Sequence, residues 1–226
     1  MEDNAVLSLA SYPLADSESL LSYVKSLPQS DACILSSVSV ANQEIVDVLM
    51  QKSIHFMELT AGTAIPIRNL YKTPETLGKD RLAAIVGAYG LFPGRDILVF
   101  DVGTALTIDF IDKDGNYRGG NISPGLNMRF RALHDYTQQL SLQTPKDDYN
   151  LLGDTTASAI VSGVQNGMVF EMNHYIEHFV KKNLNLVTIF TGGDIFFFVN
   201  KINIRIFAEP NLVLIGLNNI IKYNLK

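Results

Sequence analysis

The sequence is short of the residues that mark several large classes of protein. Its 226 residues include one cysteine and no tryptophan. A single cysteine cannot form an internal disulfide, so nothing here points to an oxidising compartment. Of the four histidines, His174 and His178 stand four residues apart, but no cysteine or carboxylate set completes a metal site at ligand spacing. We interpret both as solvent-facing residues of one helix.

Long apolar runs and a basic excess are also missing. No apolar stretch is long enough to span a bilayer, and the acidic start lacks the basic and apolar regions of a secretory signal. The net charge of −5 offers no electrostatic footprint for nucleic acid. With 47% hydrophobic and 18% charged residues, the composition is that of a globular protein. These features predict a soluble, cytoplasmic protein that binds neither membrane nor nucleic acid.

The first half of the chain alternates between strand and helix patterns. The spacing of apolar residues predicts strands at 4–13, 32–40 and 54–59 and helices at 17–28, 43–52 and 75–94. Ser17 is a candidate cap of the first helix, and the third is expected to begin near Leu77 and to end at Gly90 and Pro93. Alternation of this kind favours an α/β architecture with some parallel pairing.

The second half begins with three consecutive strand patterns. They predict strands at 97–103, 105–112 and 117–124, the last two joined by Asp114-Gly115, a strong hairpin signal. Helices are predicted at 124–140, 156–183 and 210–224, and further strands at 186–190 and 205–209. This order is that of a ribonuclease-H-like lobe. We therefore predict two lobes, residues 1–94 and 95–226, each with a mixed sheet flanked by helices.

The sequence Asp101-Val-Gly-Thr104 stands at the tight turn between two predicted strands. Gly103 would let backbone N–H groups approach an anion, and the Thr104 hydroxyl would add a donor. Asp101 could hold a cation that offsets phosphate charge. A plain β-turn capped by Asp101 explains these four residues equally well.

Two further short segments carry possible chemistry. Gly192 and Gly193, in Thr-Gly-Gly-Asp after a strand, would let a flat ligand or a phosphate approach the backbone, although a bare strand-to-helix turn explains them too. In Gly78-Lys-Asp-Arg81, Asp80 at a helix start could accept a hydroxyl proton and Arg81 could grip a carboxylate. The alternative is a surface charge pair at a helix start.

Taken together and in order, these pieces resemble the type III pantothenate kinases of the acetate-kinase, sugar-kinase, Hsp70 and actin superfamily. The resemblance rests on YKTPETLGKDR, DVGTALTID, GGNISPGLNMRFRAL, GDTTASAIVSGVQNG and TGGD, and covers nearly the whole chain. It implies two ribonuclease-H-like, actin-like ATPase lobes. It also implies ATP-dependent phosphorylation of pantothenate, the first step of coenzyme A synthesis, by a homodimer whose active site lies near the subunit interface.

The resemblance also assigns roles to single residues. Asp80 matches the general base. Asp101 matches the site of a monovalent cation, K⁺ or NH₄⁺, and Mg²⁺ would accompany ATP. The residues that match ATP-binding positions are Gly103, Thr104, Gly192 and Gly193. Those that match pantothenate-binding positions are Tyr71, Gly78, Lys79, Arg81 and Thr156, and the neighbouring Thr155 leaves a one-residue ambiguity at the last.

One family motif is not found in this sequence. Family members carry a first phosphate arm, Asp-x-Gly-Asn-Thr, after their first strand, and the segment around Asp3-Asn4 has neither its glycine nor its threonine. We therefore expect an incomplete first lobe and negligible phosphorylation by these 226 residues alone. Two explanations stay open: Met1 is an internal methionine of a longer kinase, or the protein is a degenerate relative. In-frame DNA upstream that encodes the arm would favour the first.

Two other functions stand beside the kinase. A non-catalytic dimeric protein could keep the pantothenate pocket and act as a regulator or accessory factor. Another phosphotransferase or phosphohydrolase of the actin-like fold is the third possibility, and Gly78-Lys-Asp-Arg81 with Tyr71 argues against it.

Overall fold

The computed structural model describes residues 6–13, 15–37, 42–182 and 185–225. The chain forms two compact units, one of residues 1–66, 72–87 and 213–226, the other of residues 67–71 and 88–212. No helix among the described residues is long and apolar enough to cross a membrane. The predicted lobe boundary at residue 94 stays a prediction.

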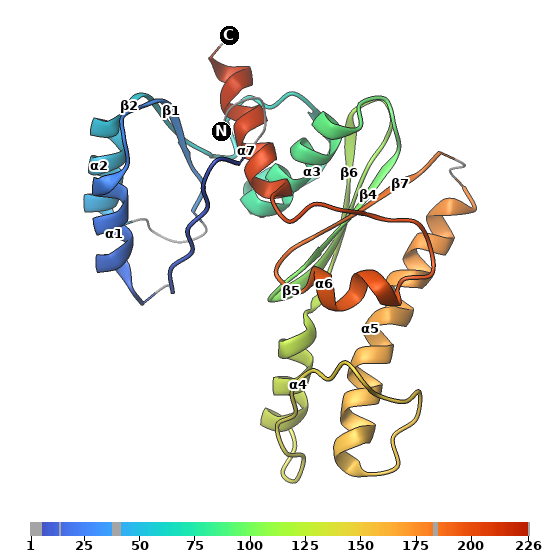
Figure 1. Cartoon of the computed structure of the whole chain (residues 1–226). Coiled ribbons are helices and arrows are strands. Elements are labelled where there is room, and N and C mark those ends of the chain that lie inside the picture. The colour runs from blue at the N-terminus through green and yellow to red at the C-terminus, as the bar shows by residue number, and fades with distance from the viewer. Residues whose placement is uncertain (1–5, 14, 38–41, 183–184, 226) are drawn as a thin grey trace. The chain divides into compact units, whose positions relative to one another are not determined.

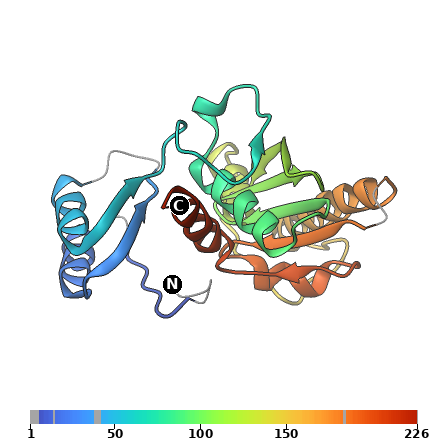
Figure 2. The same ribbon diagram turned by 90° about the horizontal axis from the view of Figure 1, so that it is seen from above.

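The first unit contains a parallel pair of strands. Its elements are α1 (Ser17–Ser26), β1 (Ser30–Leu35), α2 (Gln43–Lys52), β2 (Ser53–Glu58), the 3-10 turn η1 (Pro74–Thr76), most of α3 (Lys79–Leu91) and most of α7 (Leu212–Asn224). Strands β1 and β2 pair in register from Ser30 with Ser53 to Leu35 with Glu58. Helices α1 and α2 lie together on one face of this pair (Figures 1 and 2). The alternation of strand and helix predicted here is confirmed.

Three predictions in the first unit need correction. Residues 6–13 form no strand, because the sheet of β1 and β2 offers no third strand among the described residues for them to pair with. The rest of that predicted strand, and the end of the one predicted at 32–40, lie outside the described residues. Asp16, rather than Ser17, caps α1, since its Oδ1 accepts a hydrogen bond from the Ser19 N–H at 3.2 Å. Helix α3 begins at Lys79, not near Leu77, and η1 precedes it.

The second unit is built on one six-stranded mixed sheet. Its elements are β3 (Arg68–Asn69), β4 (Ile97–Val102), β5 (Ala105–Ile111), β6 (Asn116–Pro124), α4 (Leu126–Asp135), α5 (Thr156–Val180), β7 (Val187–Thr191), α6 (Ile195–Phe198), η2 (Val199–Lys201) and β8 (Phe207–Ala208). The strand order is β3-β6-β5-β4-β7-β8. Strands β4, β5 and β6 are an antiparallel meander, and β7 and β8 add parallel to β4. This topology is the ribonuclease-H-like arrangement that the sequence predicts.

The β5–β6 hairpin forms where Asp114-Gly115 predicts it. Gly115 has φ +77°, a conformation that costs glycine little. Asp112 holds the turn by accepting hydrogen bonds from the backbone N–H groups of Asp114 and Asn116 at 3.1 and 2.9 Å. Burial acts to raise the pKa of Asp112, but the hydrogen bonds of Asn116 and the nearby Arg118 guanidinium lower it overall.

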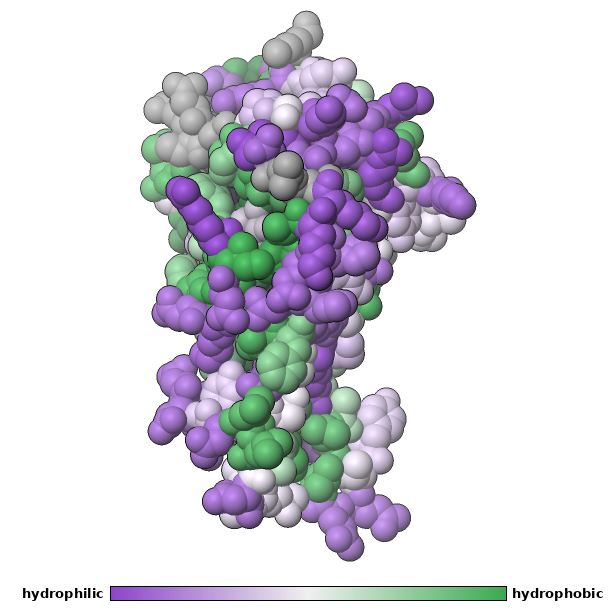
Figure 3. Space-filling model, turned by 90° about the vertical axis from the view of Figure 1, so that its right-hand side faces the viewer, coloured by the Kyte–Doolittle hydropathy of each residue, from purple (hydrophilic) through white to green (hydrophobic). Residues whose placement is uncertain are grey.

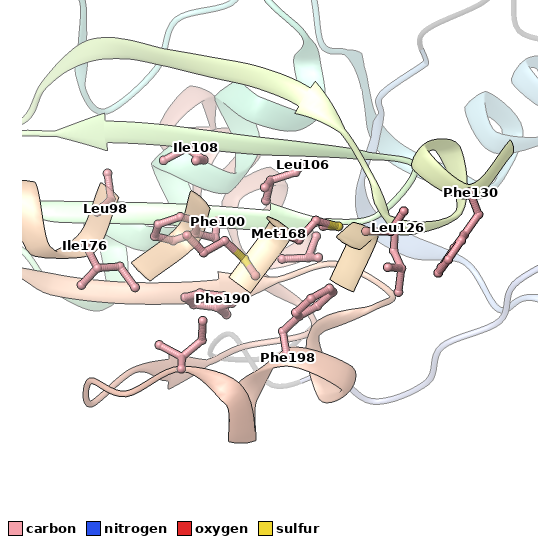
Figure 4. Close-up of a cluster of buried hydrophobic side chains, with 14 of the residues drawn as sticks. Leu98, Phe100, Leu106, Ile108, Leu126, Phe130, Met168, Ile176, Phe190 and Phe198 are labelled. Atoms are coloured by element: carbon pink, nitrogen blue, oxygen red, sulfur yellow. The ribbon is translucent and has the colours of Figure 1, made fainter. Parts of the chain in front are cut away.

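The core of this unit lies between the sheet and α5. Phe100 of β4 and Phe190 of β7 stack with ring centroids 4.7 Å apart, and Met168 of α5 packs with them (Figure 4). The buried residues of α5 recur along one face of the helix from Ile160 through Val164, Met168 and Met172 to Ile176, which is the pattern that predicts this helix. Full burial of one such side chain stabilises the fold by about 1.5–3 kcal/mol. The core therefore anchors β4, the strand that leads into the turn at Gly103 and Thr104.

Helices α4 and α5 end sooner than predicted. Helix α4 stops at Asp135 rather than near residue 140, and α5 stops at Val180.

A polar network joins both helices to the sheet: Ser123 Oγ donates to Glu171 Oε1 at 2.7 Å, and Arg129 forms an ion pair with the same carboxylate. This network fixes the start of α4 beside the end of β6.

Candidate active site

The turn between β4 and β5 is closed by backbone hydrogen bonds. The Gly103 N–H donates to the Ala105 carbonyl at 3.0 Å, and the Gly125 N–H donates to the Thr104 carbonyl at 3.1 Å. Asp101 is half-buried, whereas Thr104 is exposed and no described residue accepts a hydrogen bond from its hydroxyl. The turn thus presents a free hydroxyl to solvent from a rigid strand end.

The second glycine turn packs against the first. Thr191 pairs with Asp101 across β4 and β7, and the Asp194 N–H donates to the Val102 carbonyl at 2.9 Å. Gly192 has φ +96°, and a Cβ atom there would come within 2.5 Å of Asp101 Oδ1. Glycine is therefore required at 192 by the fold itself. Two motifs far apart in the sequence meet at one edge of the sheet.

A hollow of about 700 Å³ opens beside the two turns. It is lined by both turns and by α4, through Gly103, Thr104, Gly193, Asp194, Asn127, Met128, Arg131, Ala132, Asp135 and Tyr136. The described residues include no group of three histidine, cysteine, aspartate or glutamate side chains able to hold a metal ion. His174 and His178 are both exposed on α5, as their spacing predicts.

Gly103 and Gly193 differ from Gly192 in a way that bears on function. Neither has a positive φ, and a Cβ atom on Gly193 would meet nothing within 4 Å. On Gly103 the nearest atom would be Asp101 Oδ1, at an ordinary 3.8 Å. The fold would therefore accept a side chain at either position. Their effect is to leave the hollow open to a ligand that touches the backbone.

The Asp194 carboxyl lies at the rim of this hollow, and burial raises its pKa. A raised pKa means that folding disfavours the charged form, so the protein gains stability as pH falls through the folded value. We expect Asp194→Asn to raise the melting temperature by about 1–2 °C at pH 7 and by less near pH 4. Thermal unfolding of both proteins across this pH range measures the effect; a difference that grows on acidification would contradict it.

The Gly78-Lys-Asp-Arg81 segment forms the N-terminus of α3, in the first unit. Asp80 Oδ1 accepts a hydrogen bond from the Arg81 N–H at 2.8 Å, so the carboxylate folds back over the start of the helix. A Cβ atom on Gly78 would lie 2.5 Å from that oxygen, and glycine is thus required for this placement. Asp80 remains exposed, whereas the Arg81 side chain is only 5% exposed. Lys79 pairs with Glu58 of β2 at 3.6 Å.

Tyr71 and Thr156 belong to the second unit. Tyr71 follows β3, and its ring stacks on Tyr117. Thr155 is the N-cap of α5 and forms a capping box with Ser158, while Thr156 is exposed and its hydroxyl bonds to no described residue. The predicted residues are thus divided: 78–81 lie in the first unit, and Tyr71, Asp101, Thr156 and the two glycine turns lie in the second.

Sequence reasoning missed several residues around these turns. Asn127, Arg131 and Asp194 line the hollow, and only the position of Asp194 directly after the paired glycines hinted at this. Asp109 and Tyr117 form a buried polar pair behind Tyr71. A charged residue between the apolar Ile108 and Phe110 of a predicted strand was the available signal for that pair.

The strand order and the pairing directions of the second unit define a ribonuclease-H-like fold. The sequence profile described as type III pantothenate kinase matches residues 11–178. The chain belongs to the type III pantothenate kinase family.

Individual relatives agree with this membership. The type III pantothenate kinase of Phocaeicola vulgatus is 48% identical over 191 residues, which cover 84% of this chain and 79% of that protein. The one from Porphyromonas gingivalis is 36% identical over 227 residues, covering 99% and 92%. Among solved structures, a conserved member of the Baf family of transcriptional activators from Campylobacter jejuni superposes with a TM-score of 0.60 at 23% identity, covering 91% and 88%. That structure supports the fold alone.

Proposed function

We propose that this protein transfers the γ-phosphate of ATP to the primary hydroxyl of pantothenate, the first step of coenzyme A synthesis. The observation that carries the proposal is the hollow beside Thr104, which two glycines keep open although the fold does not need them there. Family membership supplies the substrate. Because the reaction consumes ATP and feeds coenzyme A synthesis, we place it in the cytoplasm.

The reaction needs one proton acceptor and a well-placed pair of substrates. The pantothenate hydroxyl oxygen bonds to the γ-phosphorus, the bond from that phosphorus to the β–γ bridging oxygen breaks, and ADP leaves. Asp80 accepts the hydroxyl proton, a role for which its exposed carboxylate at a helix N-terminus is suited. Phosphoryl transfer depends mainly on positioning and charge neutralisation, so the remaining residues bind and orient.

Pantothenate is held at its carboxylate and along its chain. A guanidinium binds a carboxylate through two parallel hydrogen bonds, and we assign this contact to Arg81. We assign further substrate contacts to Gly78 and Lys79 in the first unit and, separately, to Tyr71 and Thr156 in the second. Between the two candidate threonines, the hydroxyl of Thr155 is committed to the cap of α5, which favours Thr156.

ATP binding is assigned to the two glycine turns, with Thr104 donating to a phosphate. Asp101 Oδ1 and the Val102 carbonyl oxygen both lie where a Cβ atom of residue 192 would meet them, and such oxygens can coordinate K⁺ or accept hydrogen bonds from NH₄⁺. Mg²⁺ is held largely by phosphates and water, so it needs few protein ligands. When bound, these cations would offset phosphate charge.

A homodimer is supported by the apolar surface of α4 and α5. A groove of about 560 Å³ between them is lined mainly by apolar atoms, among them Leu133, Ile160 and Val164. Six large apolar residues between positions 122 and 152 are also exposed: Ile122, Met128, Tyr136, Leu142, Leu151 and Leu152. Figure 3 shows hydrophobic residues exposed on this end of the molecule. Monomers seldom expose apolar patches of this extent, and we infer that a second copy covers it.

Gly163 provides a test of that dimer surface. It lines the groove, and a Cβ atom there would meet nothing within 4 Å, so the fold tolerates a side chain. We expect Gly163→Arg to yield a monomer by light scattering after size exclusion, because a desolvated charge would enter the interface. Gly163→Ala is the matched control and should remain a dimer. A dimeric Gly163→Arg protein would contradict this placement.

The kinase proposal is tested on the product of the native gene. Incubation with ATP, Mg²⁺, K⁺ and pantothenate should give phosphopantothenate by mass spectrometry, and Asp80→Asn should lower the rate about 100-fold or more. The second candidate is a pantothenate-binding protein without activity, in which Arg81 and Tyr71 would still contact the ligand. Saturable pantothenate binding with no product in either protein would support that candidate and refute the kinase.

A further inference from the structure

A buried polar pair lies directly behind Tyr71. The Tyr117 hydroxyl donates a hydrogen bond to Asp109 Oδ1 at 2.7 Å. Tyr117 is fully buried and Asp109 is only 2% exposed. A carboxylate is costly to bury, and an apolar residue at either position would fill a core without that cost. The pair therefore calls for an explanation other than packing.

Tyr71 is placed against this pair by both its backbone and its ring. Strand β3 pairs with β6 so that Asn69 lies opposite Tyr117, and the Tyr71 N–H donates to Asn69 Oδ1 at 2.9 Å. The Tyr71 and Tyr117 rings are nearly parallel, at 11°, with centroids 6.0 Å apart. The orientation of one ring thus limits the orientation of the other.

Two glycines of β6 lie beside the side chains of Tyr71 and Asp109. Gly119 has φ +105°, and a Cβ atom there would lie 3.4 Å from the Tyr71 ring. Gly120 pairs with Asp109 across the sheet, and a Cβ atom there would overlap the Asp109 carboxylate. Gly120 therefore leaves the space that the Asp109 carboxylate occupies, and Gly119 permits the backbone conformation of β6 beside Tyr71.

We propose that Tyr117 and Asp109 are positioning residues that fix the ring of Tyr71 for contact with pantothenate. This inference rests on the proposed function, since it takes Tyr71 as a substrate contact. The hydrogen bond to Asp109 holds the Tyr117 ring in one rotational position. The stacked Tyr71 ring is then pre-ordered, and pantothenate binds without first having to order it.

The test measures pantothenate binding by calorimetry on the 226-residue chain. Tyr117→Phe keeps the stacking ring but removes the donor to Asp109, and we expect the Kd for pantothenate to rise about 10-fold. Asp109→Asn keeps an acceptor oxygen and should raise the Kd for pantothenate by a smaller factor. Tyr89→Phe is the matched control: it removes a hydroxyl that donates to the Lys113 carbonyl at 3.3 Å, and its Kd should match that of the unaltered chain.

A double substitution separates positioning from general loosening of the fold. If Tyr117 acts through Tyr71, then Tyr117→Phe should have no further effect on the Kd in a Tyr71→Ala background, because coupled sites are not additive. A full additional 10-fold loss in that background would overturn the proposal.

Different results would overturn the positioning role and the proposed function. If the unaltered chain binds pantothenate and Tyr117→Phe binds it equally well while remaining folded, only the positioning role is overturned. If Tyr117→Phe does not fold, the Kd of Asp109→Asn is measured with and without Tyr71→Ala instead. Additive effects of these two substitutions on the Kd would likewise overturn the positioning role. If the unaltered chain binds no pantothenate, the positioning role is overturned, whereas the kinase proposal is decided separately by product formation with the native gene product.

Discussion

Replacing Arg81 by alanine is expected to weaken pantothenate binding about 100-fold or more, so that calorimetry detects no saturable heat. The Arg81 side chain is 5% exposed and stands at the first turn of α3, beside the exposed carboxylate of Asp80. A charge-assisted hydrogen bond shielded from water is stronger than one in solvent, so loss of this guanidinium should remove a large part of the binding free energy. Its fork also matches the two carboxylate oxygens in a way that a lysine does not.

Two control variants distinguish loss of the Arg81 contact from loss of the folded structure. Arg81→Lys keeps the charge but not the fork, and should bind pantothenate with intermediate affinity. Arg118→Ala removes an arginine whose partner, Asp112, is in the β5–β6 hairpin, and should leave binding unchanged. All variants are checked by circular dichroism. Unchanged affinity in a folded Arg81→Ala protein would refute the assignment of Arg81.

Gly193→Val is expected to reduce ATP binding about 100-fold without unfolding the protein. Gly193 lines the hollow and has open space where a Cβ atom would stand, so the branched side chain would project into the volume assigned to the nucleotide. Pantothenate affinity should stay the same. Binding of ATP with Mg²⁺, followed by calorimetry beside a pantothenate titration, measures both.

Gly192→Ala is the informative contrast to Gly193→Val. Gly192 has φ +96° and lies close to Asp101 Oδ1, so any side chain at position 192 would be strained. We therefore expect the main effect of Gly192→Ala to be a lower melting temperature of the protein. One glycine should thus report on stability and its neighbour on ligand binding. Equal ATP affinity in Gly193→Val and the unaltered chain would contradict the nucleotide assignment.

Local signals predicted the second unit well. Asp114-Gly115 specified the β5–β6 hairpin because a tight turn needs residues that accept positive φ, and Gly115 has it. The apolar spacing of residues 156–183 predicted α5 because a helix of that length must bury one face. The order of strands and helices was enough to predict the ribonuclease-H-like topology, since few arrangements connect such elements.

Pairings between distant segments were harder to predict. Residues 6–13 have the composition of a strand, but a strand forms only where another offers its backbone groups. The contact of Gly192 with Asp101 and the Tyr117–Asp109 hydrogen bond both depend on how β7 and β6 are placed beside their neighbours. The spacing of apolar and polar residues along the sequence does not specify how distant strands pair.

The most direct test of the account is a pair of calorimetric titrations of this chain, one with pantothenate and one with pantothenol, in which an alcohol replaces the carboxylate. If Gly78-Lys-Asp-Arg81 forms a pantothenate site, pantothenate should bind saturably at one site per chain and pantothenol should bind at least about 100-fold more weakly. Equal binding of the two compounds, or no binding of pantothenate, would contradict the account.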